Sequence, residues 1–421
     1  MRLPVWHLTW ASLRNRGLAS VLTLIAIALS VTLLLGVDRL RTDARAGFAS
    51  TLSGTDLIVG ARSGAVPLLL YSVFHIGDAT ANVSWKSIQA IEANPAVDWV
   101  VPLSLGDSHK GFRVVGTTPG YFTHYRYGDR TALRFADGGP FSGVFDAVVG
   151  AEVARTLGYA PGARIVLSHG AGEFSGAEHA DKPFTITGVL APTGTPVDRT
   201  VLVSLGAIEA IHLDWAGGSH IPGVEIPPEF VRKFDLTPKS VTAALVGLAQ
   251  RTAVFRVQRE INGFKAEPLQ AILPGVTLDQ LWRVVGIAER VLLAVSAFVV
   301  LVGLAGLVAM MVGALSARRR ELAILRAMGA GPRDVFVLLL AESLVLSAAG
   351  CVLGVVMLWG LSAALAPWLA TAHGLQLVPR LIDLRELALL AGVIGAAALA
   401  ALVPAWRAYR YSLADGMSVR M

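Results

Sequence analysis

The sequence predicts an α+β membrane protein: four transmembrane helices, arranged as one plus three, carry a large mixed α/β extracytoplasmic domain on a helical stalk. Of its 421 residues, 54% are hydrophobic and only 16% are charged, whereas charged residues make up about 25% of an average soluble domain. Four apolar stretches are long enough to cross a bilayer. A more polar region, residues 38–290, separates the first stretch from the other three.

The first span is predicted at residues 18–37. Arg14 and Arg16 precede this apolar stretch, and Asp38 and Arg39 follow it directly. Because no small-residue cleavage site follows, we interpret the stretch as a retained span; a signal peptide is the alternative at this position.

Residues 1–17 are expected to form a short cytoplasmic helix that lies in the membrane interface. Trp6, Trp10 and Leu13 recur at helical spacing beside basic residues. Aromatic side chains and cations in this arrangement suit a helix with one face among the lipid headgroups. The alternative is a polar lead-in without defined structure.

The distribution of arginines predicts the orientation. The remaining spans are predicted at residues 291–316, 335–361 and 387–405. Arginines cluster before the first span, in the loop 317–334 and in the tail 406–421. Because positively charged loops stay in the cytoplasm, both termini are expected inside. Residues 38–290 and the loop 362–386 are then expected outside.

Residues 38–290 are predicted to form a mixed α/β domain. Short apolar runs that alternate with polar residues or end at glycine predict strands. The predicted strands are Thr55–Gly60, Phe112–Thr117, Val148–Gly150, Phe184–Leu190 and Thr200–Ser204, and the predicted helices are Ser87–Asn94 and Ala151–Leu157. The polar, Gly-rich segment His169–Lys182 is expected to be an exposed loop or hairpin tip. Thr277–Arg290 is expected to extend the second span outward, paired with an extension of the first span over Asp38–Phe48.

The histidines of this domain are weak candidates for a metal site. His169, His179, His212 and His220 lie near acidic residues in the sequence, and imidazoles with carboxylates can bind zinc or copper. They have no compact HxH or HExxH spacing, so the interpretation is separate surface histidines and no metal. The only cysteine, Cys351, lies in an apolar run, which excludes an intrachain disulfide and a CxxC site.

The predicted spans contain few polar groups. Glu342 lies inside the third span, where an ionisable residue is a functional candidate; we favour a role in helix packing over one in proton or substrate handling. Gly350 and Gly354 allow close approach of a neighbouring helix. No line of polar residues crosses the spans, which favours a protein that transmits motion over one that conducts a hydrophilic substrate.

Four stretches together resemble a known family. They are the loop Ala317–Val335, the small-residue stretch Gly350–Gly354, the exit from the last span at Leu402–Arg410, and the segment Val149–Gly158 followed by Pro161, Gly162 and the predicted strand Phe184–Leu190. In this order, and with the one-plus-three topology, nearly the whole chain resembles the permease subunit of MacB- and FtsX-type ABC transporters, also called type VII or mechanotransmission proteins.

The resemblance implies that the loop 317–334 contains a coupling helix that contacts an ATPase. The expected contact residues are Arg318, Arg319, Arg320, Glu321, Leu322, Leu325, Arg326, Met328 and Gly329. The apolar ones recur at helical spacing, so one face can enter a groove on a partner. For the three consecutive arginines, the alternative is a role in topology alone.

No phosphate-binding GxxxxGK[ST] motif occurs in the chain. The chain is therefore not expected to be an enzyme or to bind a cofactor itself. The resemblance places ATP and magnesium in a separate ABC ATPase subunit.

The function implied is that of a multi-pass permease of the bacterial inner membrane. It couples ATP hydrolysis to motion of its periplasmic domain, and so drives export or extraction of a lipoprotein, peptide, amphiphile or metal-associated factor. The expected partners are the ATPase, a second permease protomer and membrane lipid, with a periplasmic adaptor or substrate-binding protein as a further candidate, but no nucleic acid.

Two alternatives stay open. One is an FtsX-like mechanical regulator that activates a periplasmic partner without transport. The other is an enzyme or receptor whose outer domain acts alone. Asp146, Glu152 and Asp198 are acidic residues available for catalysis, but they form no recognisable catalytic constellation in the sequence.

Overall fold

The computed structural model describes Thr9, Trp10, Arg14 and residues 17–414, apart from residues 171–178, 217–218, 221–225, 318–330 and 374–379. The chain divides into two units. The sheet domain comprises Arg45–Val285, and the helical unit comprises Met1–Ala44 and Gly286–Met421. The predicted interfacial helix, residues 1–17, lies almost entirely outside the described residues.

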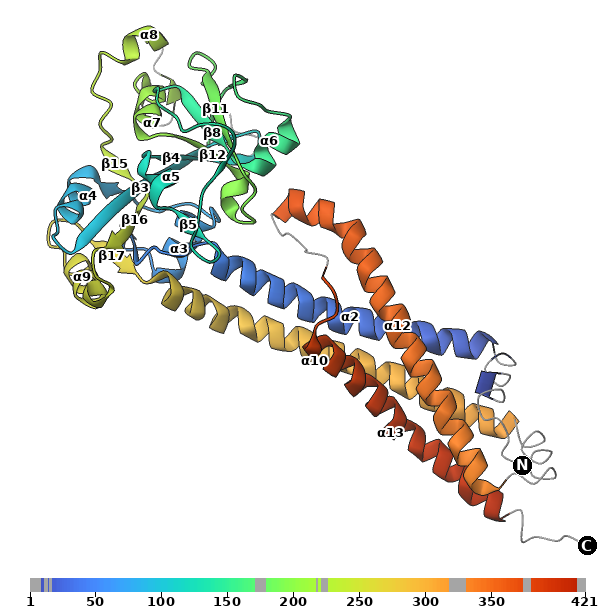
Figure 1. Cartoon of the computed structure of the whole chain (residues 1–421). Coiled ribbons are helices and arrows are strands. Elements are labelled where there is room, and N and C mark those ends of the chain that lie inside the picture. The colour runs from blue at the N-terminus through green and yellow to red at the C-terminus, as the bar shows by residue number, and fades with distance from the viewer. Residues whose placement is uncertain are drawn as a thin grey trace, which may run out of the picture. The chain divides into compact units, whose positions relative to one another are not determined.

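A mixed sheet forms the centre of the sheet domain (Figure 1). Its strands, in spatial order, are β17 (Leu269–Ile272), β1 (Leu57–Ala61), β16 (Ala243–Leu248), β3 (Val97–His109), β4 (Phe112–Thr117), β12 (Thr200–Ser204), β8 (Asp146–Val149), β11 (Phe184–Leu190) and β7 (Phe135–Gly138). β10 (Ser168–His169) pairs with β3, and β9 (Arg164–Ile165) pairs with β11. The pairs β4–β12 and β8–β11 are parallel.

Short ladders and helices complete the domain. The two-stranded ladders are β2 (Val83–Ser84) with β15 (Ser240–Val241), β5 (Arg126–Tyr127) with β6 (Thr131–Ala132), and β13 (Trp215–Ala216) with β14 (Ser219–His220). The helices are α3 (Ala65–Val73), α4 (Trp85–Glu92), α5 (Gly120–His124), α6 (Ala151–Leu157), α7 (Leu205–Ile211), α8 (Pro228–Val231) and α9 (Val254–Asn262), with 3₁₀ turns η1 (Pro196–Arg199) and η2 (Arg251–Ala253).

Helices cover both faces of the sheet, so its central strands are buried on both sides. Successive side chains of a strand point to opposite faces. On β1, Ile58 packs with residues of α3 and α5, while Leu57 and Val59 pack with residues of α4 and α9. On β12, Leu202 joins the first of these clusters, and its neighbours pack with residues of α6 and α7. This two-sided burial explains why such strands are nearly continuous apolar runs.

In the described part of the helical unit, four long helices stand out: α2 (Gly17–Ser50), α10 (Pro274–Ala317), α12 (Pro332–His373) and α13 (Leu384–Ala414) (Figure 1). Each contains a window apolar enough to cross a membrane. The apolar parts of all four contribute to one buried cluster that includes Ile27, Leu307, Cys351 and Ala397. The chain is thus an α+β membrane protein with the expected one-plus-three arrangement.

The expected helical extensions are present. Thr277–Arg290 lies within α10, and Asp38–Phe48 lies within α2. The helix α12 continues to His373, past residue 361, where the third span is predicted to end; the boundary of the span itself stays a prediction. This part of the sequence lacks glycine and is rich in Ala and Leu, which are strong helix formers.

Candidate functional site

The predicted ATPase-contact residues, Arg318 to Gly329, lie outside the described residues. The structure shows only how the loop ends: α10 ends at Ala317 and α12 begins at Pro332. The backbone N–H of Gly331 donates to Oδ2 of Asp334 at 2.8 Å. An acidic side chain in the first turn stabilises a helix start. The coupling role of the loop stays a prediction.

The two predicted packing glycines lie against α2. A Cβ atom added to Gly350 would lie 2.6 Å from Cγ2 of Ile27. One added to Gly354 would lie 2.8 Å from the carbonyl oxygen of Ala28. The Gly354 carbonyl also accepts a hydrogen bond from Oγ1 of Thr32 at 3.0 Å. Glycine therefore permits the close approach of α12 and α2.

Glu342 is buried on α12, at 2% exposure. Its neighbour Ser343 donates to the carbonyl of Ala397 on α13 at 3.1 Å. Ser343 thus lies where α12 packs on α13, and the packing role of Glu342 stays a prediction.

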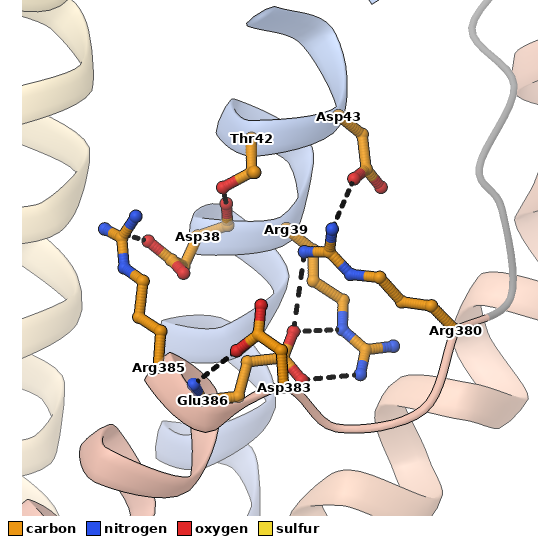
Figure 2. A network of polar contacts seen from close by, with 8 residues as sticks. All are labelled: Asp38, Arg39, Thr42, Asp43, Arg380, Asp383, Arg385 and Glu386. Carbon is orange, nitrogen blue, oxygen red and sulfur yellow. Dashed lines mark hydrogen bonds and ion pairs between the residues drawn. The ribbon is translucent and has the colours of Figure 1, made fainter. Parts of the chain in front are cut away.

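A polar network, absent from the sequence-based candidates, joins α2 to the start of α13 (Figure 2). Glu386 is fully buried, and its carboxylate accepts two hydrogen bonds from Arg39, at 2.7 Å from Nε and 2.8 Å from Nη2. This bidentate pair is the strongest geometry that the two side chains can adopt. Arg380 adds a longer contact to Glu386 at 3.7 Å.

Further ion pairs flank this one. Arg385 lies 2.8 Å from Asp38, and Arg380 lies 3.2 Å from Asp43. Asp383 accepts a hydrogen bond from the backbone N–H of Glu386 at 2.7 Å and so caps α13. We define the polar network as Asp38, Arg39, Asp43, Arg380, Asp383, Arg385 and Glu386. Every charged group in it contacts another polar group, so its chemistry is that of a fastening between α2 and the start of α13.

α2 also contacts α10 inside the helical unit. Arg41 lies 2.8 Å from Glu289. Deeper in the unit, Oγ of Ser30 is 3.2 Å from the carbonyl of Val299. In the sheet domain the same two helices meet again, where Phe48 packs edge-on against Trp282 at 5.5 Å. The paired extensions expected from the sequence are therefore present.

Three of the four candidate histidines converge in the sheet domain. His169, His179 and His212 place one ring nitrogen each, together with a carboxylate oxygen of Asp107, within 4.8 Å of one another. We define these four residues as the histidine cluster. This departs from the expectation of separate surface histidines. The fourth candidate, His220, lies on β14 opposite Trp215 in the ladder, but its side chain is not among those described.

Different elements position the four side chains. Asp107 on β3 and His169 on β10 are directly opposite each other across the antiparallel ladder. His212 caps the C-terminus of α7. The backbone N–H of His179 donates to the carbonyl of Leu167 at 2.9 Å, which fixes its chain segment beside β10. Asp107 lies within an irregularity of β3, between Leu105 and Ser108, and so the periodicity of the strand did not indicate it.

The contacts inside the histidine cluster are short. Nδ1 of His169 lies 3.2 Å from Oδ1 of Asp107 and 3.2 Å from Nε2 of His212. Nε2 of His212 lies 3.8 Å from the same carboxylate oxygen. The Asp107 carboxylate raises the pKa of His169 through its hydrogen bond.

His179 is the exception in the cluster. It is fully buried, and neither of its ring nitrogens has a hydrogen-bond partner among the described residues. Burial lowers its pKa to about 4, so the imidazole is neutral near pH 7. An unsatisfied buried polar group costs about 1–3 kcal/mol, and native structures retain few of them.

A buried ion pair holds two parts of the histidine cluster together. Nζ of Lys182 lies 2.7 Å from Asp214, and both side chains are fully buried. Lys182 follows His179 by three residues, and Asp214 follows His212 by two. The prediction that His169–Lys182 is an exposed loop is therefore wrong at its C-terminal end. The ammonium group is buried there because it has a carboxylate partner.

The three acidic residues considered for catalysis have structural contacts. Asp198 accepts hydrogen bonds from the backbone N–H groups of Thr193 and Gly194, both at 2.8 Å. Asp146 accepts from Ser142 N–H at 3.0 Å. Glu152 lies 3.7 Å from Arg199. Each carboxylate fastens a turn or a neighbouring helix.

Comparisons with known proteins agree with this architecture. The model of the MacB-like periplasmic core domain matches residues 20–262, and that of the FtsX-like permease C-terminal region matches residues 293–413. None of the curated proteins matches the chain.

Two solved structures are similar to part of the chain. The periplasmic region of MacB from Actinobacillus actinomycetemcomitans is 9% identical, with a TM-score of 0.34, and the match covers 55% of this chain and 94% of that one. The extracellular domain of the ABC-type transporter YknZ from Gram-positive bacteria is 15% identical, with a TM-score of 0.29, and the match covers 52% of this chain and 99% of that one.

The first family match alone spans more than half of the chain. The two matches follow each other in sequence, the first over the sheet domain and the second over the last three long helices. The chain belongs to the MacB/FtsX-type family of ABC transporter permeases, with a MacB-like periplasmic core domain and an FtsX-like C-terminal region.

Proposed function

We propose that this chain is a permease subunit that converts ATP hydrolysis by a separate ABC ATPase chain into movement of its sheet domain. The basic loops then face the cytoplasm with both termini, and the sheet domain lies in the periplasm of a bacterial cell. Two permease protomers work with two ATPase protomers, because symmetric dimers are the usual solution. The movement drives export or extraction of a periplasmic or membrane-held substrate.

The observation that carries this proposal is the continuity of α2 and α10. Each helix continues without a break across the boundary between the helical unit and the sheet domain. At about 1.5 Å per residue, the 44 residues of α10 extend about 66 Å, about twice the thickness of the hydrocarbon core. A helix of this length transmits a displacement at one end to the other.

The polar network supports the same proposal. Through Arg39 and Glu386 it fastens α2 to the helix α13, and α13 packs closely with α12. A shift of α12, which follows the predicted coupling loop, therefore reaches α2 through packed helices and paired charges. Movements of this kind, in which packed helices slide or rotate together, are common in switching proteins.

Co-purification tests the coupling. The chain is purified from its native membrane in mild detergent, and the proteins that accompany it are identified and quantified. A stoichiometric ABC ATPase is expected. Leu325→Asp and Met328→Asp place a charge on the predicted contact face and should release the ATPase, with the thermal unfolding of the sheet domain unchanged.

The matched control is Phe255→Asp. Phe255 lies on α9 of the sheet domain and is 62% exposed, so this variant should keep the ATPase. Retention of the ATPase by Leu325→Asp and Met328→Asp would overturn the contact assignment. A cell-wall hydrolase in place of a transported substrate would favour the mechanical-regulator alternative within the same family.

A further inference from the structure

We propose that the histidine cluster of the sheet domain binds one divalent transition-metal ion, with Zn²⁺ as the reference ion. The ligands are one carboxylate oxygen of Asp107 and one ring nitrogen each of His169, His179 and His212. The site is independent of the proposed coupling to an ATPase, because all four residues lie in the sheet domain.

The spacing of the donor atoms fits a tetrahedral ion. Zn²⁺ binds imidazole nitrogen and carboxylate oxygen at about 2.0–2.2 Å. Two ligands of a tetrahedron with such bonds lie about 3.3–3.6 Å apart. The measured contacts among Asp107, His169 and His212 are 3.2, 3.2 and 3.8 Å, and all four donors fit within 4.8 Å. Small side-chain adjustments therefore suffice to close the coordination shell.

The orientation of His212 is that of a metal ligand. Its Nδ1 lies 2.7 Å from the carbonyl oxygen of Ile208. That carbonyl can only accept, so Nδ1 carries the proton and Nε2 presents its lone pair to the cluster. Histidine ligands typically donate their other ring N–H to a carbonyl or carboxylate, which fixes the ring and the tautomer.

His179 is the residue that distinguishes a metal site from a cluster held together by hydrogen bonds alone. Hydrogen bonds alone account for the contacts of Asp107, His169 and His212, but they leave His179 without a partner among the described residues. A bound ion supplies that partner. The environment is also pre-assembled, because the ring of His179 packs against Trp215 at 4.5 Å and His212 at 5.2 Å.

The donor set selects the class of ion. Three imidazoles and one carboxylate suit zinc, copper, nickel or iron, whereas calcium and magnesium require mostly oxygen ligands. The four ligands come from β3, β10, the end of α7 and the segment before Lys182. A bound ion therefore cross-links four parts of the sheet domain.

Metal titration of the full-length chain in detergent tests the proposal. The protein is first stripped with a chelator, and Zn²⁺ is then titrated against a chromogenic competitor. One ion per chain is expected. His179→Leu and Asp107→Asn should each weaken binding at least roughly 100-fold, since loss of even an outer-shell partner costs 10- to 100-fold. Co²⁺ should give the visible absorption of a tetrahedral complex, and this signal should disappear in both variants.

The matched control is His124→Gln, because His124 lies in the same domain but stacks on Trp99. It should bind one ion with wild-type affinity. Thermal unfolding without metal verifies that each variant is folded. Zn²⁺ should raise the unfolding temperature of the wild type and of His124→Gln, but not that of His179→Leu or Asp107→Asn. Equal binding by the wild type and His179→Leu, or no stoichiometric binding by the wild type, would overturn the site.

Discussion

The polar network of the helical unit and the histidine cluster of the sheet domain both gather ionisable side chains from distant parts of the sequence. They differ in how completely those groups are paired. In the network, Glu386 is fully buried and Arg39 is paired with it in bidentate geometry. In the cluster, His179 is equally buried and has no hydrogen-bond partner among the described residues.

This difference in pairing suits the polar network to holding helices together and the histidine cluster to binding a ligand. A buried charge that is fully paired stabilises one arrangement of the chain. Removing it destabilises the fold, because its partner stays buried without a counter-charge. A buried donor or acceptor without a partner instead requires an explanation, of which a bound ion is one. The sheet domain contains both kinds side by side, because the paired Lys182 and Asp214 hold the segments that carry His179 and His212.

The largest effect is expected from Lys182→Met. It leaves the fully buried Asp214 without its cation, and breaking a buried pair costs about 3–5 kcal/mol. Chemical unfolding of the full chain in detergent, followed by tryptophan fluorescence, measures this loss. The double variant Lys182→Met/Asp214→Leu should recover most of it, because no fully buried charge is left unpaired; Asp181, the other partner of Lys182, is 39% exposed. Equal stability of the single and double variants would show that the pair is not what fastens these segments.

A smaller effect is expected from Glu386→Gln. The amide keeps the shape of the carboxylate but removes its charge, and hydrogen bonds to charged groups contribute about 1.5–3 kcal/mol. Thermal unfolding in detergent should therefore shift downward. We also expect weaker stimulation of the partner ATPase by substrate, if the network relays movement between α13 and α2.

Asp279→Asn is the control for Glu386→Gln, because it removes one charge from an exposed ion pair. Asp279 and Arg283 form an ion pair one helical turn apart on α10, and both side chains are 67% exposed. Exposed pairs contribute about 0–1 kcal/mol. If Glu386→Gln changed stability no more than Asp279→Asn, the network would be a surface feature and not a fastening.

Local patterns in the sequence were sufficient for several elements. β4, β11, β12 and α6 begin and end where the sequence predicted them. The three strands are short runs dominated by apolar residues, and α6 ends directly before Gly158. β3 was missed. It contains Pro102 and Gly106, and its alternation is interrupted between Leu105 and Ser108.

Neither polar site could be derived from local patterns. Arg39 and Glu386 are 347 residues apart in the sequence, and no periodicity connects them. The sequence indicated the histidines as weak candidates for a metal site, but it did not indicate Asp107. Only the pairing of β3 with β10 places Asp107 opposite His169. The charges at the end of the first span and before the fourth were visible, and only their pairing was not.

The smallest effect on stability is expected from His179→Leu in the absence of metal, and this variant tests the comparison most sharply. Leucine has a similar volume and removes two buried polar atoms that lack partners, so the metal-free protein should lose no stability. With Zn²⁺ at a hundredfold excess over its dissociation constant, the wild type should gain about 2.7 kcal/mol and the variant nothing. Unfolding with and without Zn²⁺ measures both values.

A large loss of stability in the metal-free variant would mean that His179 is a structural group like Lys182. The two regions would then differ in composition but not in role.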